Sequence, residues 1–304
     1  MANVTKTMAD TAGFIPQVWA QKALDVLRTQ IVLARLVSKD SDFEPAWKGK
    51  TLNIPYPGTF TAQDKAADTA AVLQTPTGGA TVAVNLNKHK TVDFIVEDVA
   101  RAQASSDLLD RYVRPAAIAL GDAVEDDLFA LYTGFVANAV GTSGTDVTSA
   151  TIRNARKKMN DNKAPMSGRS LIVSSKDEIS LLGDTNLQTF FAMQRGSAIA
   201  NGSIGNLYGF DTYMSQRVPV VAGTPNSTKN LAITKDSMIL ATRPFQAPPA
   251  NSGVLATTIQ DPETGLMIRV LYAYDVSFRG VRIAFDILYG AVVLRAECGS
   301  VVLS

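Results

Sequence analysis

The sequence predicts an α+β chain whose longest elements extend beyond a compact core. Apolar residues alternate with period two from Val82 to Val96, a pattern typical of a half-buried strand. A second apolar stripe recurs at three- and four-residue steps from Leu109 to Phe135, which is typical of a helix. Residues 149–182 then alternate between helical and strand patterns. Because the strand and the first helix are both far longer than average elements, we expect a plate-like molecule.

Composition and charge exclude several classes of protein. The chain has 304 residues, 46% of them hydrophobic, so it is long enough to bury a large core. Its 29 Lys and Arg against 28 Asp and Glu give a formal net charge of +1, which supplies no overall attraction for nucleic acid or an anionic membrane. The single cysteine, Cys298, and the single histidine, His89, exclude an internal disulfide and a Cys/His zinc site. The sequence contains no signal-peptide core and no membrane-length apolar run, so we expect a protein made in a reducing cytoplasm.

The first predicted element is an amphipathic helix that follows a polar leader. Pro16 suits a first helical turn, and an apolar stripe begins at Trp19. The stripe continues at three- and four-residue steps, at Ala23, Val26, Gln30, Leu33 and Val37. The pattern fits two structures equally well, an arm that projects from the body and an ordinary core helix.

Two strands with a long polar excursion between them predict a hairpin-like arm. The first strand alternates Leu52, Ile54 and Tyr56, and its two prolines place it at a sheet edge. Residues 59–80 are rich in Thr, Ala, Asp and Gly and hold too few large apolar side chains to form a core of their own. The second strand is the alternating stretch that ends at Val96, which would extend roughly 50 Å at about 3.3 Å per residue.

The long helix follows the hairpin. Its inward positions are Leu109, Val113, Ala117, Leu120, Val124, Leu128, Leu131 and Phe135. At about 1.5 Å per residue this stripe would be roughly 40 Å long. Pro115 removes one backbone donor, so we expect it to kink the helix or to split off the first turns.

No group of residues predicts catalysis. His89 lies between two lysines on the arm, far from any nucleophile motif, so a solvated strand position is favoured over a catalytic base. Four acids crowd the long helix: Asp122, Glu125, Asp126 and Asp127. They could hold Mg²⁺ or Ca²⁺, but one helical turn without converging loops is a poor metal cage. A solvated or subunit-facing stripe is therefore the favoured interpretation.

A local basic patch lies further along the chain, on the helix predicted from residue 149. Its members are Arg153, Arg156, Lys157, Lys158 and Lys163. Nucleic-acid binding is one interpretation, but the patch lacks interleaved aromatic residues. We expect an exposed helix face whose cations are paired with acidic neighbours.

These observations predict a structural protein that is not an enzyme and needs no cofactor. No group of residues predicts catalysis. Several elements are so long that a single copy could not bury their apolar faces. We therefore expect neighbouring copies to complete the fold.

The sequence resembles the major capsid proteins of tailed bacteriophages with the Hong Kong-type capsid fold, in the branch of short coat proteins without a large inserted domain. Seven segments carry the resemblance in the family's order: "FIPQVWAQKALDVL…LARLV", "KGKTLNIPYPG", "VDFIVEDVARAQASSDLLDRY", "ALGDAVEDDLFALY", "GRSLIVS", "NGSIGNLYGFDTYMSQRVP" and "FDILYGAVVLRAE". They span nearly the whole chain. One small departure is Ala296, where the family often has proline.

The resemblance implies an α+β shell subunit built from five regions. These are an N-terminal arm (1–49), an extended loop with its strands (50–97), a peripheral domain with a long spine helix (98–147), an axial α/β domain (148–265) and C-terminal strands that return to both domains (266–304). Assembly residues are then expected in the arm at Ile15, Pro16 and Trp19. They are expected in the extended loop at Asp64, Lys65, Val82, Val84, Leu86, Lys88, Val92 and Phe94, and on the spine helix at Leu109, Val113, Pro115, Leu120, Val124 and Leu128.

The resemblance also implies partners and a life cycle. The subunit would form pentamers and hexamers of an icosahedral virion shell, made in the cytoplasm of a bacterial host. Its partners would be a separate scaffolding protein, a portal protein and weakly contacted double-stranded DNA, with decoration proteins left open. The shell would expand on DNA packaging, with the spine helix bending at Pro115. The long ribbon ending at Val96 would lie over an adjacent subunit, which would bury its apolar face.

Three alternatives remain at this point. An encapsulin-like compartment would keep the fold and enclose a protein cargo. An enzyme of an unfamiliar α/β class would use the acidic residues of the long helix. A tail or adhesion protein would form tubes or fibres.

Overall fold

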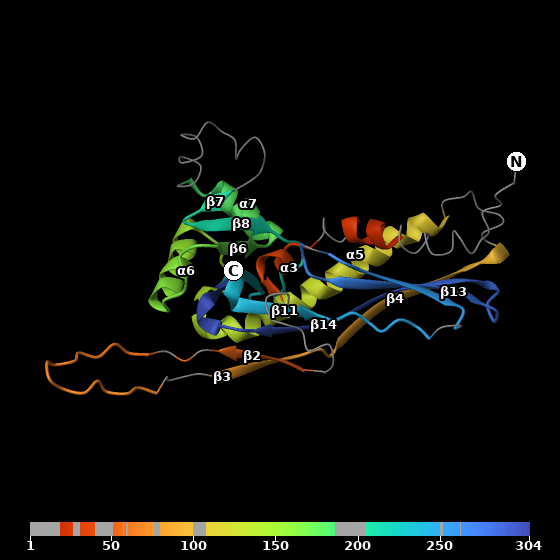
Figure 1. Cartoon of the computed structure of the whole chain (residues 1–304). Helices are drawn as coiled ribbons and strands as arrows, with labels where there is room; N and C mark the ends of the chain where they lie inside the picture. The colour runs from red at the N-terminus through yellow and green to blue at the C-terminus, as the bar shows by residue number, and fades with distance from the viewer. Residues whose placement is uncertain are drawn as a thin grey trace, which may run out of the picture.

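The computed structural model is an elongated α+β molecule with a projecting hairpin (Figure 1). It describes residues 19–26, 31–39, 51–56, 58, 60–75, 80–99, 108–185, 205–249, 252–261 and 263–304. A long sheet and the long helix α5 (Leu108–Phe129) run side by side, and a second, smaller domain lies at one end of them. The hairpin of β2 (Thr51–Tyr56) and β3 (Ala80–Asn85) extends past that domain.

The larger sheet forms the body of the molecule. Its strands follow the order β1 (Ser38–Lys39), β11 (Met238–Thr242), β14 (Gly280–Val293), β13 (Met267–Asp275) and β12 (Val254–Gln260). β4 (Lys88–Glu97) pairs antiparallel with β14, from Glu97 opposite Gly280 to Lys88 opposite Tyr289. β14 therefore has hydrogen-bonded neighbours on both edges, and its side chains Ile283, Phe285 and Ile287 are fully buried.

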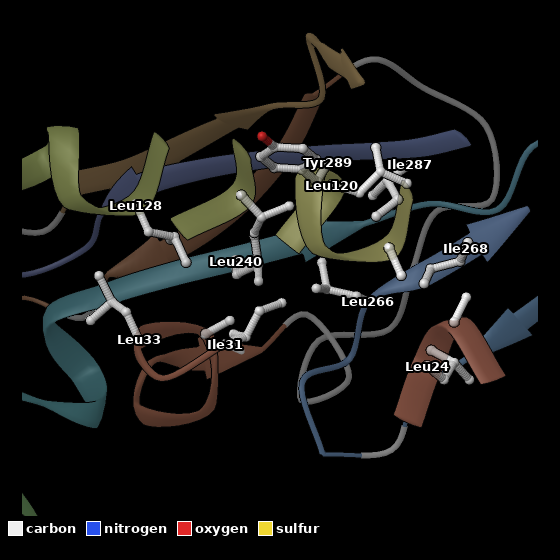
Figure 2. Close-up of a cluster of buried hydrophobic side chains, with 14 of the residues drawn as sticks. Leu24, Ile31, Leu33, Leu120, Leu128, Leu240, Leu266, Ile268, Ile287 and Tyr289 are labelled. Carbon is white, nitrogen blue, oxygen red and sulfur yellow. The ribbon is translucent and has the colours of Figure 1, made fainter. Parts of the chain in front are cut away.

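Helix α5 packs across one face of this sheet, on the side chains predicted to point inward. Val113, Ala117, Leu120, Val124 and Leu128 are all buried, so the predicted stripe is confirmed over these positions. Figure 2 shows Leu120 and Leu128 of the helix gathered with Leu240, Ile287 and Tyr289 of the sheet. Full burial of each large apolar side chain contributes about 1.5–3 kcal/mol, so this interface holds the body together.

The stripe continues beyond α5 in a tighter helix. Residues Ala130–Asn138 form the 3₁₀ helix η2, and Phe135 within it is fully buried. Pro115 lies inside α5. Its predicted kink stays a prediction. Leu109 lies in the helix, with its side chain outside the described part of the chain.

The N-terminal segment packs into the core of its own chain. Residues 19–26 are helical, α3 (Leu33–Leu36) follows, and β1 pairs parallel with β11. Trp19 is buried, with its ring 5.8 Å from that of Tyr272. The core-helix alternative therefore holds for Trp19, and the expectation of a projecting arm at this residue is wrong, because the apolar stripe faces the chain's own sheet. Ile15 and Pro16 lie outside the described residues.

The smaller domain is a second sheet with helices on it, as the helix–strand–helix pattern predicts. Its strands follow the order β5 (Val140–Gly141), β15 (Gly299–Leu303), β10 (Ser227–Thr234), β6 (Arg169–Val173), β8 (Phe210–Met214) and β7 (Asn206–Leu207), and β9 (Val220–Val221) also pairs with β10. The helices are α6 (Ser149–Asp161) and α7 (Ser175–Gly183), whose N-caps are Thr148 and Ser174. A separate core forms between helices and sheet, around Ile152, Met159 and Phe210.

Two strand placements differ from what chain order suggests. β11 and β12 fall inside the predicted axial segment 148–265, yet both lie in the larger sheet. The C-terminal strands were expected in both domains, and β13 and β14 lie in the larger sheet while β15 lies in the smaller one. Periodicity identifies a strand but carries no information on its partner, so chain order alone could not assign these strands. The 3₁₀ turns η3 (Lys235–Ser237) and η4 (Ala296–Cys298) connect β10 to β11 and β14 to β15, and α5 with η2 connects β4 of the larger sheet to β5 of the smaller one.

Candidate assembly site: the extended loop and the acidic cluster of the long helix

The predicted hairpin exists, and its base rests on the larger sheet. β2 and β3 pair antiparallel, with Leu52 opposite Val84 and Ile54 opposite Val82. Leu52, Ile54, Val84 and Leu86 pack on Ile239 and Ala241 of β11 in a small core of their own. The period-two alternation therefore has its apolar side on this chain's own sheet.

The tip loop, defined as residues 60–75 between these strands, is exposed. It has no regular strand or helix, apart from a turn that Ala66 and Thr69 close by hydrogen bonds. Asp64 and Lys65 are both exposed there. Three large apolar side chains of the tip loop are also exposed, Phe60 by 68%, Val72 by 71% and Leu73 by 96%. Contiguous exposed apolar surface is typical of interaction sites, and these three side chains lie on one loop.

The ribbon expected to cover a neighbour instead lies on its own chain over most of its length. It breaks at residues 86–87 into β3 and β4, and β4 then pairs along β14. Val92 and Phe94 pack against the core beneath α5, and Val96 is buried there. The expectation that an adjacent subunit buries this apolar face is wrong from Val84 to Val96. The predicted alternation is confirmed, because the even-numbered side chains of the ribbon point inward.

Between β3 and β4 the backbone passes directly over Gly290 of β14. A Cβ on Gly290 would lie 2.2 Å from the backbone oxygen of Asn85 and 3.3 Å from Cα of Leu86. Any larger residue at this position would force the two backbones apart. The hairpin therefore leaves the body at a point of direct backbone contact with β14.

Lysines at the start of β4 bind the long helix. Lys88 Nζ lies 3.0 Å from Oδ1 of Asp127, and Lys90 Nζ lies 3.5 Å from Oδ2. The hydroxyl of Tyr289 donates to the same Oδ2 at 2.5 Å. Burial would raise the pKa of Asp127, but the hydrogen bond from Tyr289 and the charges of both lysines outweigh burial and lower it. Burial and the same carboxylate raise the pKa of Tyr289.

Glu125, on the next face of the helix, is a buried acceptor for the N-terminal segment. Its Oε1 accepts hydrogen bonds from the backbone N–H of Val32 at 2.6 Å and of Leu33 at 2.5 Å. Its Oε2 accepts from Ser215 Oγ at 3.2 Å. Burial raises the pKa of Glu125, and these hydrogen bonds offset part of that rise. One carboxyl thus satisfies two donors that α3 leaves unpaired at its start.

Arg217 of the smaller domain completes the cluster. Its guanidinium binds both carboxylate oxygens of Asp126 and lies 3.9 Å from Oδ2 of Asp122. The hydrogen bond to Asp126 raises the pKa of Arg217. A forked guanidinium–carboxylate pair sets orientation as well as distance. This pair therefore fixes the loop that carries Ser215 and Arg217 relative to α5.

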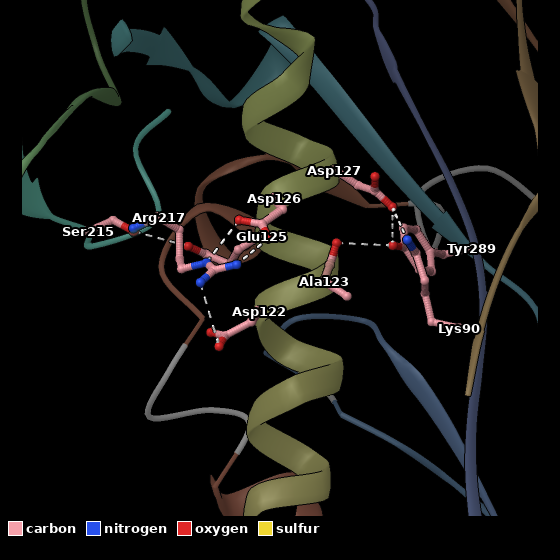
Figure 3. A network of polar contacts seen from close by, with 9 residues as sticks. All are labelled: Lys90, Asp122, Ala123, Glu125, Asp126, Asp127, Ser215, Arg217 and Tyr289. Atoms are coloured by element: carbon pink, nitrogen blue, oxygen red, sulfur yellow. Dashed lines mark hydrogen bonds and ion pairs between the residues drawn. The ribbon is translucent and has the colours of Figure 1, made fainter. Parts of the chain in front are cut away.

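Figure 3 shows Arg217 and Ser215 on one side of the helix and Lys90 and Tyr289 on the other. The acidic cluster, defined as Asp122, Glu125, Asp126 and Asp127, joins α5 to the N-terminal segment, the start of β4, β14 and the smaller domain. The expectation of a solvated stripe is wrong for Glu125, which is buried, while Asp126 is exposed and Asp122 and Asp127 are partly exposed. All four acids have cations or donors of the same chain as partners, and contact with another subunit stays a prediction. Sequence reasoning missed these partners, since Arg217 and Ser215 lie about ninety positions away and carry no local motif.

No metal centre emerges from the described part of the chain. Within it, no group of three or more metal-ligating side chains converges. His89 is half-exposed, with its ring 4.8 Å from that of Phe245 and its Nε2 3.8 Å from Asp286. In the same portion of the chain, no helix is both long and apolar enough to cross a bilayer.

Comparisons with family profiles and solved structures identify a family and a fold. A family profile described as "Phage capsid protein" matches residues 79–294. No curated protein sequence matches the chain. A structure from Mycobacterium phage Che8 superposes with a TM-score of 0.66 at 21% identity, over 90% of this chain and 91% of that one.

Two further solved structures share the fold. The capsid of Cyanophage P-SCSP1u has a TM-score of 0.65 at 15% identity, over 90% of this chain and 87% of its own. The capsid of a native GTA particle has a TM-score of 0.55 at 13% identity, with 89% of each chain covered. At these identities the likeness establishes the fold, the Hong Kong-type capsid fold that the sequence predicts.

Proposed function

We propose how this chain builds a shell from the premise that it belongs to the phage capsid protein family, whose profile matches well over half of its length. The chain is a major capsid protein, a structural component of the virion that assembles with its own copies. An encapsulin-like shell around a protein cargo is not favoured, since the matching family is that of phage capsids.

In this proposal, the tip loop is the element that joins one copy to the next. The support is the exposure of Phe60, Val72 and Leu73 on a loop whose two strands are anchored firmly on the body. A loop with a rigid base and an apolar tip loses little conformational freedom when a second copy covers it. Asp64 and Lys65, exposed in the same loop, would pair with charges of that copy and set its register.

Surface variants of the tip loop test this proposal. Phe60→Ser and Leu73→Ser should leave the subunit folded and soluble, because both side chains are largely exposed and belong to no core. They should lower the yield of closed shells seen by negative-stain electron microscopy. Met166→Ser is the matched control, since Met166 is exposed by 74% on the smaller domain. Normal shell yield from both loop variants would refute the proposed role of the loop.

The finer assembly pathway follows as part of the same proposal. Copies form pentamers and hexamers of an icosahedral shell, with help from a scaffolding protein and around a portal protein. The shell expands when double-stranded DNA is packaged, and α5 bends at Pro115, where the helix lacks a backbone donor. The proposal does not require decoration proteins to bind the shell. Electron microscopy of the chain with and without its scaffolding protein tests the assembly pathway. Analysis of purified particles for DNA and for protein cargo tests what the shell encloses.

A further inference from the structure

The segment that contains α6 carries a concentrated positive charge. Residues 149–169 hold six Lys and Arg but one acid, Asp161, a formal charge of +5 in a chain of net charge +1. The rest of the chain has 23 Lys and Arg against 27 Asp and Glu, a formal charge of −4. The basic residues are therefore strongly segregated onto one helix and the turn after it.

The cations point away from the core of the smaller domain. Ile152, Ala155 and Met159 fill the buried side of α6. The opposite side exposes Arg153 and Lys157, and Lys163 is exposed just beyond the helix end. Figure 1 shows α6 at the outer edge of the smaller domain, with no other helix of the figure covering it.

In the part of the chain that the structure describes, the expected ion pairs with acidic neighbours are missing. Among the described residues, none of the six cations forms an ion pair with an acid. Arg156 instead donates to the backbone oxygen of Tyr208 at 2.6 Å, and the guanidinium of Arg153 lies 5.9 Å from the centre of the Tyr208 ring. The expectation of a helix face neutralised by acids is therefore wrong in this part of the chain.

The environment of Arg169 also indicates that the positive charge of this segment is not neutralised. Arg169 is buried and donates to the backbone oxygens of Pro165 and Ala164. Burial, and then the like charge of Arg156, lower the pKa of Arg169. Cations that repel one another and that, among the described residues, form no ion pair attract a mobile or external anion.

We propose that the basic face, defined as Arg153, Lys157, Lys158 and Lys163, contacts the phosphate backbone of the enclosed double-stranded DNA. This inference rests on the proposed function, in which the shell holds that DNA. At about 1.5 Å per residue α6 is roughly 20 Å long, and duplex DNA carries one phosphate charge per about 1.7 Å of axis. The four cations, three of them exposed and Lys158 partly exposed, lie along the helix and just beyond its end, so each can meet a phosphate.

The contact is sequence-independent and weak for a single copy. The face exposes no aromatic side chain for stacking on bases, and Tyr208 is occupied by Arg153. About four phosphate contacts predict a slope of log K against log salt near −3 to −4. Affinity should then fall on the order of 100-fold between 50 and 200 mM salt, so many copies can line the DNA without holding it permanently.

The test measures binding of the unassembled full-length chain to short duplexes of two unrelated sequences, by fluorescence anisotropy over a salt series. Lys157→Gln should weaken binding to both duplexes equally and make the slope shallower by about 1. Lys157→Gln with Lys163→Gln should make it shallower by about 2. Lys235→Gln, which removes an exposed charge on η3 outside the basic face, should leave the slope unchanged.

Shell assembly of the same variants separates this inference from the proposed function. Normal shells with an unchanged salt slope would overturn the DNA contact and leave the function standing. Unchanged DNA binding together with lost shells would overturn it too, and would assign the basic face to an acidic surface of another copy. A wild-type chain that forms no shells under any condition would instead contradict the proposed function.

Discussion

At the scale of single residues, Asp127 and Glu125 use the same chemical group for opposite purposes. Asp127 keeps part of its surface in water and gathers two lysines and a tyrosine, so its charged form is favoured. Glu125 is buried and receives only neutral donors, so its charged form is disfavoured. Two carboxyls half a turn apart on one helix should therefore contribute to stability with opposite pH dependence.

Asp127→Asn should lower the melting temperature by a few degrees at pH 7, equivalent to about 1 kcal/mol. The pKa of Asp127 is lowered in the folded chain, so its stabilisation is present above the ordinary value of 3.8 and is lost as pH falls through the folded pKa. Melting curves of both proteins, recorded from neutral pH down to about pH 2, should converge at the acid end. Asp146→Asn, which breaks an exposed pair with Lys176, should change little at any pH.

Glu125→Gln should flatten the dependence of melting temperature on pH. The pKa of Glu125 is raised in the folded chain, so its contribution is greatest below the ordinary value of 4.5 and declines as pH rises through the folded pKa. Glutamine keeps an acceptor oxygen for Val32 or Leu33 and removes the titration.

Glu125→Ala is the comparison variant. It leaves the buried donors of Val32, Leu33 and Ser215 without their acceptor, so it should cost about 3 kcal/mol at neutral pH. Equal stability of the Ala and Gln variants would show that the hydrogen bonds of this carboxyl do not contribute to the free energy of unfolding.

At the scale of elements, the hairpin is defined by where it leaves the body. β3 ends as the backbone passes over Gly290, and β4 begins with two lysines bound to α5. The hairpin is thus held on one side by backbone contact and on the other by ion pairs, while its tip loop stays exposed. This combination gives a rigid base to a long projection.

Gly290→Ala should loosen that base. The added methyl group would clash with the backbone of Asn85, and such overpacking costs about 1–3 kcal/mol. Hydrogen exchange should become faster in β2 and β3 and stay unchanged in β10. Gly183→Ala, at a glycine with open space around it, should leave both regions as they are. Unaltered exchange in the Gly290 variant would mean that the crossing point does not hold the hairpin.

The elements could largely be predicted from sequence, and their partners could not. The stripe from Val113 to Leu128 and the alternation from Val82 to Val96 were correct, because each depends on side chains a few positions apart. The apolar faces at Trp19 and along β4 were expected to lie on neighbouring copies, but they pack on their own chain. The assembly role of these residues stays a prediction. Periodicity indicates that a face is buried but says nothing of which chain buries it.

At the scale of the whole molecule, one chain buries its body and leaves its tip loop uncovered. The larger sheet, α5 and the N-terminal segment share one core, so a single copy should fold without partners. The tip loop, residues 60–75, contributes nothing to that core. Folding and assembly should therefore be separable.

Deleting Thr61 to Thr77 tests this separation. The shortened chain should be soluble and melt within a few degrees of the full-length protein, since the described side chains of this stretch, residues 61–75, bury no core. It should form no closed shells in electron micrographs. A Gly/Ser loop of the same length keeps the length of the tip loop and removes its side chains. It therefore distinguishes the effect of the side chains from the effect of loop length. Normal particles from both variants would rule out the tip loop as the joining element.

By itself, the sequence determined the α+β class, the elements, their buried faces and the family, because all of these depend on short-range pattern and the order of segments. Only the tertiary structure decided that β4 pairs with β14, that the acidic cluster binds its own chain and that the described cations of α6 lack acidic partners. These outcomes depend on contacts between residues far apart in the chain, for which local spacing gives no signal.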